Sequence, residues 1–172
     1  MARKISLREF QESVVAKLQS LAASGAAQVS KLGVQVGSQF WLVNLSDISE
    51  ALPVPALTTV PLAQPWFFGV ANFRGNLYGI VDFCHFLGGT PTHLGVDCRL
   101  LLVHPKFMVN SGVVVSRMMG LRNPEQMQPV EAEEEPLPWI VAEYRDEAGN
   151  LWRELNMRAL TEHARFLSVG LA

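Results

Sequence analysis

Short apolar runs separated by glycine and proline are the feature that most limits the fold of this chain. Val34 and Val36 alternate with polar neighbours, and Gly37-Ser38 follows as a two-residue turn with glycine first. That order is typical of a type II′ turn between antiparallel strands. Because such runs recur at short, regular spacing, the sequence predicts a mainly β chain of small barrels rather than a parallel α/β sheet.

Two further hairpins extend this pattern. The first is expected between Val70–Phe73 and Leu77–Asp82, around a tight turn at Arg74-Gly75-Asn76. The last is expected between Trp139–Tyr144 and Leu151–Leu155, across a polar loop. In both, apolar runs flank a glycine-containing turn, which favours antiparallel pairing.

The middle of the chain leaves the position of one turn open. Arg99–His104 is a strongly apolar strand, and turns at residues 104–106 and 110–112 are both credible. The first is preferred, because it leaves Phe107–Ser116 as one long return strand. The proline-rich stretch 123–138 contains the acidic run Glu131 to Glu135 and predicts an exposed loop.

Helices are expected mainly at the two ends. An apolar stripe predicts a helix over residues 6–23, and a lone helix of this length is marginal, which favours packing on the main domain. Ser6 and Glu9 have capping-box spacing at its start, and the stripe consists of Leu7, Phe10, Val14, Leu18 and Leu21. Asn156 is expected to cap a closing helix through Phe166, and single helical turns are expected at 46–50 and 83–87.

The composition is apolar and lightly charged. Of 172 residues, 49% are hydrophobic and 17% are charged, with a formal net charge of −2. Disorder needs low hydrophobicity and high charge and is excluded, and a dedicated nucleic-acid binder needs a basic surplus and is disfavoured. No apolar run approaches the about 18 residues of a membrane span. A cytoplasmic protein is favoured, with Cys84 and Cys98 as buried thiols.

Signs of catalysis are few. The sequence has no nucleophile elbow, no phosphate loop and no dinucleotide-binding loop. An enzyme that uses Asp82 and His85 remains an alternative. The histidines are expected as ordinary side chains, because none has a His or Cys partner at metal-ligand spacing; they are His85, His93, His104 and His163.

The stretch from Pro65 to Phe83 gathers six aromatic residues around one arginine. Gly75 allows a turn with positive φ, and Arg74 lies at its edge with a planar fork of donors. From the spacing alone, two interpretations stay open. The arginine either serves a binding function or merely meets water or Asp82 in a structural hairpin.

This stretch resembles the signature of the CheW-like family, Gly-Val-x-Asn-Leu-Arg-Gly, a strand, and a closing Leu-Gly. It runs here from Gly69 to Gly75, then through Val81-Asp82-Phe83 to Leu87-Gly88. The resemblance covers roughly residues 29–166. Ala142 and Asn156 depart from the pattern, and the N-terminal helix is additional. This helix, the phrase Ala51-Leu52-Pro53-Val54-Pro55 and a divergent second lobe look like the type IV pilus (PilI-like) subgroup.

The resemblance implies two small five-stranded, SH3-like β-barrels that share a hydrophobic core, with an N-terminal amphipathic helix and a short C-terminal helix. The expected bounds are 1–27 for the helix and linker and 28–167 for the CheW-like domain. Within the domain, the first barrel spans about 34–95, the second about 98–155 and the closing helix 156–167. A tail covers 168–172.

The resemblance also implies a non-catalytic adaptor that couples a methyl-accepting chemoreceptor to the regulatory domain of a CheA-type histidine kinase, in a pathway controlling twitching motility. It implies a cytoplasmic adaptor recruited to membrane-associated receptor arrays, without cofactor, metal, nucleic acid or membrane insertion. The family's protein-binding positions fall on Ile48, Glu50, Asn72, Arg74, Gly75, Val113 and Val114. Arg74 is the first choice among them and Glu50 the second.

A different class of function stays open beside the adaptor. A small barrel with this composition could bind a hydrophobic ligand in the groove between its lobes. Trp66, Phe67 and Phe68 are the expected lining of that groove.

Overall fold

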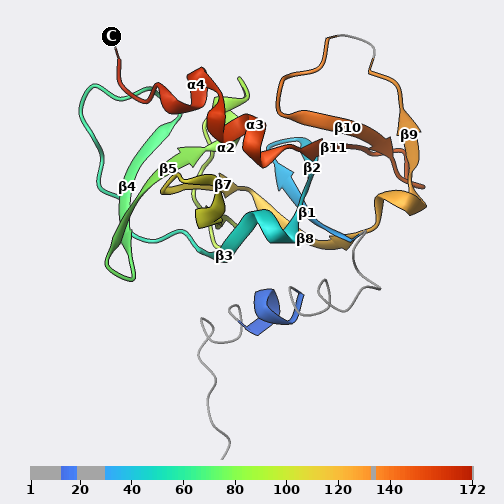
Figure 1. Cartoon of the computed structure of the whole chain (residues 1–172), viewed down its shortest axis with the longest axis horizontal. Coiled ribbons are helices and arrows are strands. Elements are labelled where there is room, and N and C mark those ends of the chain that lie inside the picture. The colour runs from blue at the N-terminus through green and yellow to red at the C-terminus, as the bar shows by residue number, and fades with distance from the viewer. Residues whose placement is uncertain (1–12, 19–29, 133–134, 172) are drawn as a thin grey trace, which may run out of the picture.

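Two β-sheets lie side by side along the long axis of the molecule, and short helices near the C-terminus lie along one side of them (Figure 1). The computed structural model describes residues 13–18, 30–132 and 135–171. Strands dominate the described residues, and the expected mainly β class is confirmed.

The first sheet has six strands in the order β8-β1-β2-β11-β10-β9. A two-residue turn at Gly37-Ser38 joins β1 and β2 as predicted, and Gly37 has a φ of +60°. The strands are β1 (Lys31–Val36), β2 (Gln39–Val43), β8 (Arg117–Arg122), β9 (Gln128–Val130), β10 (Ile140–Arg145) and β11 (Leu151–Leu155).

The second sheet has five strands in the order β3-β6-β7-β5-β4. Its central strand β7 is buried along its whole length. The strands are β3 (Ile48–Pro53), β4 (Phe67–Phe73), β5 (Asn76–Asp82), β6 (Arg99–Val103) and β7 (Ser111–Val115).

The sheets do not divide the chain near residue 98, so the expected assignment of the first and second barrels to successive halves is wrong. Strands β1 and β2 pair with strands from the end of the chain, whereas β6 and β7 join β3, β4 and β5. Strands distant in sequence pair in both sheets: β2 with β11 and β5 with β7 in parallel, and β1 with β8 and β3 with β6 antiparallel. One sheet has six strands instead of the expected five, and the closure of either into a barrel stays a prediction.

One predicted strand and one predicted helix are interrupted in the structure. The return strand begins at Ser111 rather than Phe107, because a 3-10 turn η2 (Pro105–Phe107) is followed by Met108 with a φ of +59°, which a strand does not accept. The closing helix divides at His163 into α3 (Met157–Glu162) and α4 (Ala164–Leu167). Asn156 caps α3 as expected, and the ring of His163 caps α4.

Three other short helical segments lie between the strands. A 3-10 turn η1 (Leu45–Asp47) precedes β3, so the expected helical turn at 46–50 gives way to a strand from Ile48. The expected turn after Asp82 is α2 (Phe83–Phe86). The loop expected over 123–138 contains a 3-10 turn η3 (Pro124–Gln126) and the strand β9.

One large hydrophobic core is shared by the two sheets. It includes Val34 of β1, Trp41 of β2, Leu101 of β6 and Val113 of β7. A smaller core lies on the other face of the five-stranded sheet and includes Val114. Because successive residues of a strand point to opposite faces, neighbours in β6 and β7 enter different cores. This burial on both faces accommodates much of the apolar composition.

The N-terminal region is described only over residues 13–18, which are helical. The rest of the helix predicted over 6–23 lies outside the described residues. Val15 is 7% exposed and belongs to the large core, and Leu18 packs against that core. Both cysteines are buried. Among the described residues, no helix is long and apolar enough to cross a membrane.

Candidate functional site

The turn between β4 and β5 presents Arg74 at its tip. Arg74 and Gly75 have φ values of +50° and +81°, and Phe73 pairs directly with Asn76. Positive φ at both central residues is the type I′ geometry, in which asparagine followed by glycine is preferred. The side chain of Asn72 supports the turn, because its Oδ1 accepts a hydrogen bond from the Gly75 N–H at 3.1 Å. Local turn geometry therefore accounts for Gly75 and Asn72 but not for an arginine.

The guanidinium of Arg74 extends from the hairpin tip to Glu50 on β3. Its Nη1 lies 2.8 Å from the Glu50 Oε1, and the two side chains are 63% and 21% exposed. Glu50 belongs to β3 and Arg74 follows β4, which are the two edge strands of the five-stranded sheet. The sheet therefore curls until its edges approach. An ion pair this exposed contributes only about 0–1 kcal/mol to stability.

One aromatic ring lies under the arginine and contacts a second ring. The Arg74 Cζ is 5.0 Å from the centre of the Phe73 ring, a cation–π distance. Phe73 meets Tyr78 edge-to-face at 6.5 Å, and both rings pack against the smaller core. Leu77 is 58% exposed on the same hairpin. The site thus combines one cation, one anion and apolar surface, which suits a protein partner.

The structure brings together four of the seven predicted residues: Glu50, Asn72, Arg74 and Gly75. The structure places the other three in the core, which corrects their expected place on a binding surface. Ile48 and Val113 are 1% exposed, and Val114 is 0% exposed. Their side chains fill the two cores and are unavailable to a partner that docks on the surface.

Phe73 and Leu77 lie at this candidate site, although the sequence did not single them out. Both lie within the aromatic stretch on which the resemblance rests. The signal for Phe73 was its departure from the family's leucine in Asn-Leu-Arg-Gly. Nothing in the sequence marked Leu77, because its exposure depends on how the hairpin is tilted.

Asp82 has a structural role. Its carboxylate is fully buried and accepts three hydrogen bonds, from the His85 N–H at 3.3 Å and from the Thr92 N–H and hydroxyl at 2.7 Å each. The backbone of His85 makes this contact, whereas an acid–base pair would need its ring. Burial, with a smaller effect of Asp82, raises the pKa of the Cys84 thiol, which keeps it protonated and unreactive. No group of three metal-ligating residues occurs among the described residues.

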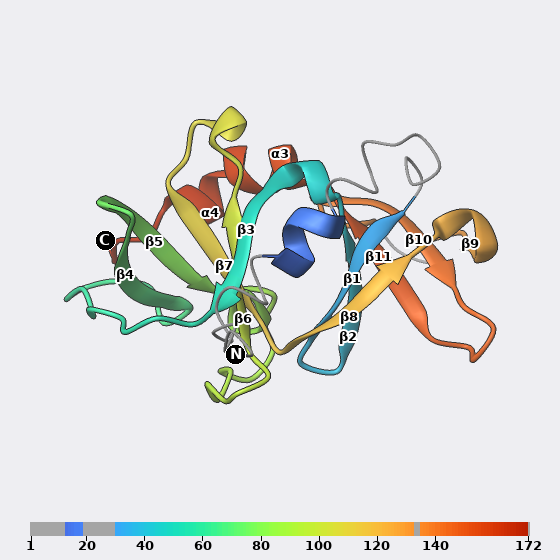
Figure 2. The same ribbon diagram turned by 90° about the horizontal axis from the view of Figure 1, so that it is seen from below.

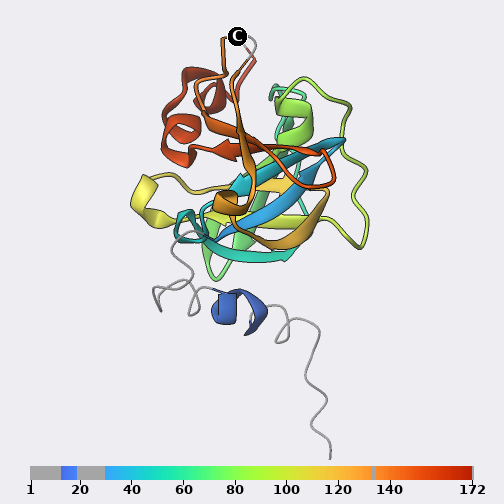
Figure 3. The same ribbon diagram turned by 90° about the vertical axis from the view of Figure 1, so that its right-hand side faces the viewer.

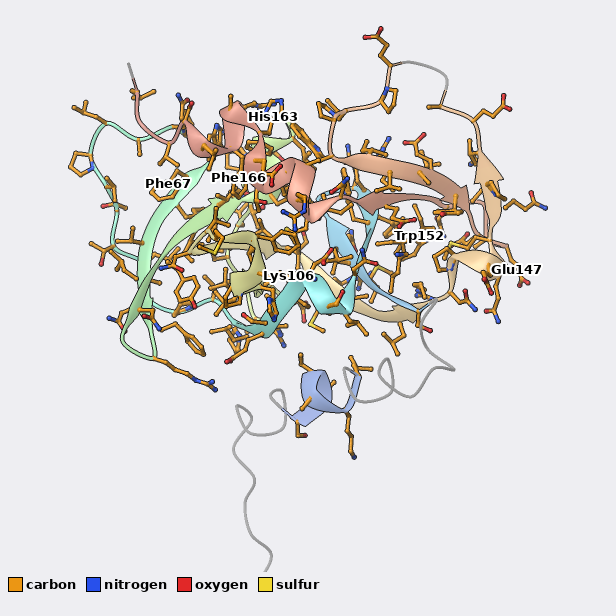
Figure 4. All side chains as sticks on the ribbon, viewed as in Figure 1. Phe67, Lys106, Glu147, Trp152, His163 and Phe166 are labelled. Carbon is orange, nitrogen blue, oxygen red and sulfur yellow. The ribbon has the colours of Figure 1, made fainter. Side chains whose placement is uncertain are left out.

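An apolar cavity of about 370 Å³ opens beside α4, but it is not the groove that the ligand-binding alternative expected. Phe67 and Phe166 line it, and Figure 4 shows them at the same end of the molecule. Trp66 instead meets Phe86 in the large core, and Phe68 packs on the smaller core. The three expected lining residues therefore do not share one pocket.

Comparisons with known proteins show the family to which the chain belongs. Residues 31–165 match the CheW-like domain, and the chain belongs to the CheW-like family. It is 31% identical over 148 residues to Protein PilI of Pseudomonas aeruginosa, which covers 83% of this chain and 80% of that protein. The resemblance to this family and to a PilI-like member is confirmed.

The fold is also similar to a solved structure, the scaffolding protein TtCheW from Thermoanaerobacter tengcongensis. The TM-score is 0.64 at 12% identity, and the match covers 79% of this chain and 94% of that one. At this identity the match bears on the fold, which it confirms.

Proposed function

We propose that this chain is a non-catalytic adaptor that couples a methyl-accepting chemoreceptor to the regulatory domain of a CheA-type histidine kinase. The pathway is a chemosensory one that controls type IV pilus twitching motility. The adaptor acts in the cytoplasm and is recruited to membrane-associated receptor arrays. Membership of the CheW-like family and the similarity to Protein PilI support this proposal.

The observation that carries the proposal is the placement of Arg74. A backbone position with positive φ at an exposed tip holds a side chain that contacts the Glu50 carboxylate and the Phe73 ring. Charged groups with adjoining apolar surface orient a reversible protein–protein contact. Glu50, Asn72, Arg74 and Gly75 are therefore proposed as protein-binding residues, with Phe73 and Leu77 beside them.

Arg74→Glu tests the proposal. Charge reversal places two carboxylates together and is expected to weaken binding to a cytoplasmic receptor fragment or to the kinase regulatory domain by about thirty-fold or more. Titration calorimetry with both purified partners measures this effect. The thermal unfolding midpoint should stay near that of the unaltered chain, because the ion pair is exposed.

Arg145→Glu is the matched control, since Arg145 is an exposed arginine at the end of β10, in the hairpin at the other end of the molecule. Its binding should equal that of the unaltered protein. Unchanged affinity of Arg74→Glu for both partners would remove Arg74 from the binding surface. Failure of the unaltered protein to bind either partner would overturn the proposed function itself.

A further inference from the structure

The helical segment 13–18 precedes the family domain, which is matched from residue 31. Val14, Val15 and Leu18 are buried or half-buried, whereas Ser13, Ala16 and Lys17 are exposed. Positions three and four apart share one face of a helix. The segment therefore presents one apolar face to the domain and a polar face to solvent.

The contacts of Val15 are with the domain itself. Every other buried member of its core cluster lies between Leu32 and Phe166, and the cluster includes Ile48 and Ala51 of β3. A side chain that is 7% exposed and joined to this cluster is held by tertiary packing. The segment is thus a small additional piece of core.

The segment docks on the side of the molecule that carries β3. It lies beside β3 in Figure 1 and Figure 3, and the view from below in Figure 2 places it over the space between β3 and β1. Those strands belong to different sheets, so the segment covers a seam between them. The edge strand β3 also carries Glu50, the ion-pair partner of Arg74.

We infer that the surface beside β3 is a helix-binding surface, and that residues 13–18 occupy it as a built-in competitor of a helical partner. The inference rests on the proposed function for the identity of that partner, a chemoreceptor helix with apolar residues three and four apart. A partner helix that reaches Glu50 over β3 takes the place of the segment. The measured affinity for this partner helix is then lowered, because only the molecules whose segment is undocked can bind it.

Within residues 13–18, Val15 is the well-buried anchor, and Leu18 and Val14 are half-buried beside it. Because β3 is an edge strand of its sheet, a segment docked beside it also covers a sheet edge while no partner is bound.

Val15→Asp in the full chain tests this inference, with Ala16→Asp as the control of equal charge on the exposed face of the same helix. The carboxylate of Val15→Asp would be buried when the segment docks, and this disfavours docking. We expect faster amide hydrogen exchange in β3 and an affinity for a purified receptor hairpin fragment raised about tenfold. Ala16→Asp should leave both unchanged. The domain should stay folded, because the segment is peripheral to both sheets.

Unchanged exchange and unchanged affinity in Val15→Asp would overturn the inference, as would faster exchange with unchanged or weaker affinity, because either result removes the competition. An equal gain in Ala16→Asp would also overturn it. If all three proteins fail to bind the hairpin while Val15→Asp alone exchanges faster in β3, the proposed coupling function fails and the self-docking of the segment is supported.

Discussion

Two hairpin turns at opposite ends of the molecule use their polar side chains in opposite ways (Figure 1). Between β10 and β11, the Asp146 carboxylate accepts hydrogen bonds from the Asn150 N–H at 2.9 Å and from the Trp152 Nε1 at 2.9 Å. All of these atoms belong to the hairpin that the loop closes. Between β4 and β5, Arg74 pairs with Glu50 on another strand instead.

The two turns also differ in which residue has a positive φ. The loop between β10 and β11 places its positive φ on Gly149, where it costs little, whereas the turn between β4 and β5 places one on Arg74. Left-handed backbone costs an ordinary residue about 1–2 kcal/mol. Asp146 therefore serves the fold of its own hairpin, and Arg74 is placed where folding alone would favour asparagine or glycine.

The largest effect on stability is expected from Asp146→Ala. Trp152 is 1% exposed, and its indole N–H loses its acceptor, at a cost of about 1–3 kcal/mol in the free energy of unfolding. Urea unfolding measures the change. Glu147→Ala is the control, because Glu147 is exposed at the same loop (Figure 4) and should change stability by less than about 0.5 kcal/mol. Receptor binding by Asp146→Ala, once folded, should be normal.

Phe73→Leu is expected to have a smaller effect, on binding instead of folding. It restores the family's residue and removes the ring beneath the Arg74 guanidinium, so Arg74 is held less firmly and affinity for the partner falls about two- to five-fold. Calorimetric titration of Phe73→Leu and Phe73→Tyr with the partner distinguishes the effect of an aromatic ring from that of side-chain size. Recovery of affinity with tyrosine supports positioning by the ring, and equal loss in both variants contradicts it.

The smallest effect is expected from pH. Burial alone would raise the pKa of Asp146, but hydrogen bonds from Trp152 and Asn150 lower it below the usual value. A lowered pKa in the folded state adds stability that is present above the unfolded-state pKa and lost as pH falls through the folded one. Urea unfolding below about pH 4 should therefore show a steeper loss in the unaltered chain than in Asp146→Ala. Parallel curves would contradict this.

Local signals predicted the hairpins well and the sheets poorly. Glycine-containing turns between apolar runs identified the strands on either side of Arg74 and Asp146, and Asn156 was recognised as a helix cap. The pairings of β2 with β11 and β5 with β7 join distant segments, so no neighbouring residues encode them. Met108 interrupts an apolar run by its backbone alone, which composition does not reveal.

The same limit applies to the site. Arg74 was recognisable because it lies in a spaced motif at a turn, where side chains project outward. Val113 and Val114 were carried over from the family's protein-binding positions, without knowledge of what covers the faces of their strand. Both faces of β7 are covered, so the period of two that separates inside from outside in a half-exposed strand gives no information there.

Arg74→Asn is the decisive substitution for a binding role of Arg74, because it separates the turn from the site. Asparagine accepts positive φ and removes the guanidinium. We predict a free energy of unfolding that is unchanged or raised by up to about 1 kcal/mol, together with a loss of receptor or kinase affinity of about tenfold or more. Loss of more than about 1 kcal/mol of stability with unchanged affinity for both partners would contradict the account and make Arg74 a residue of the fold.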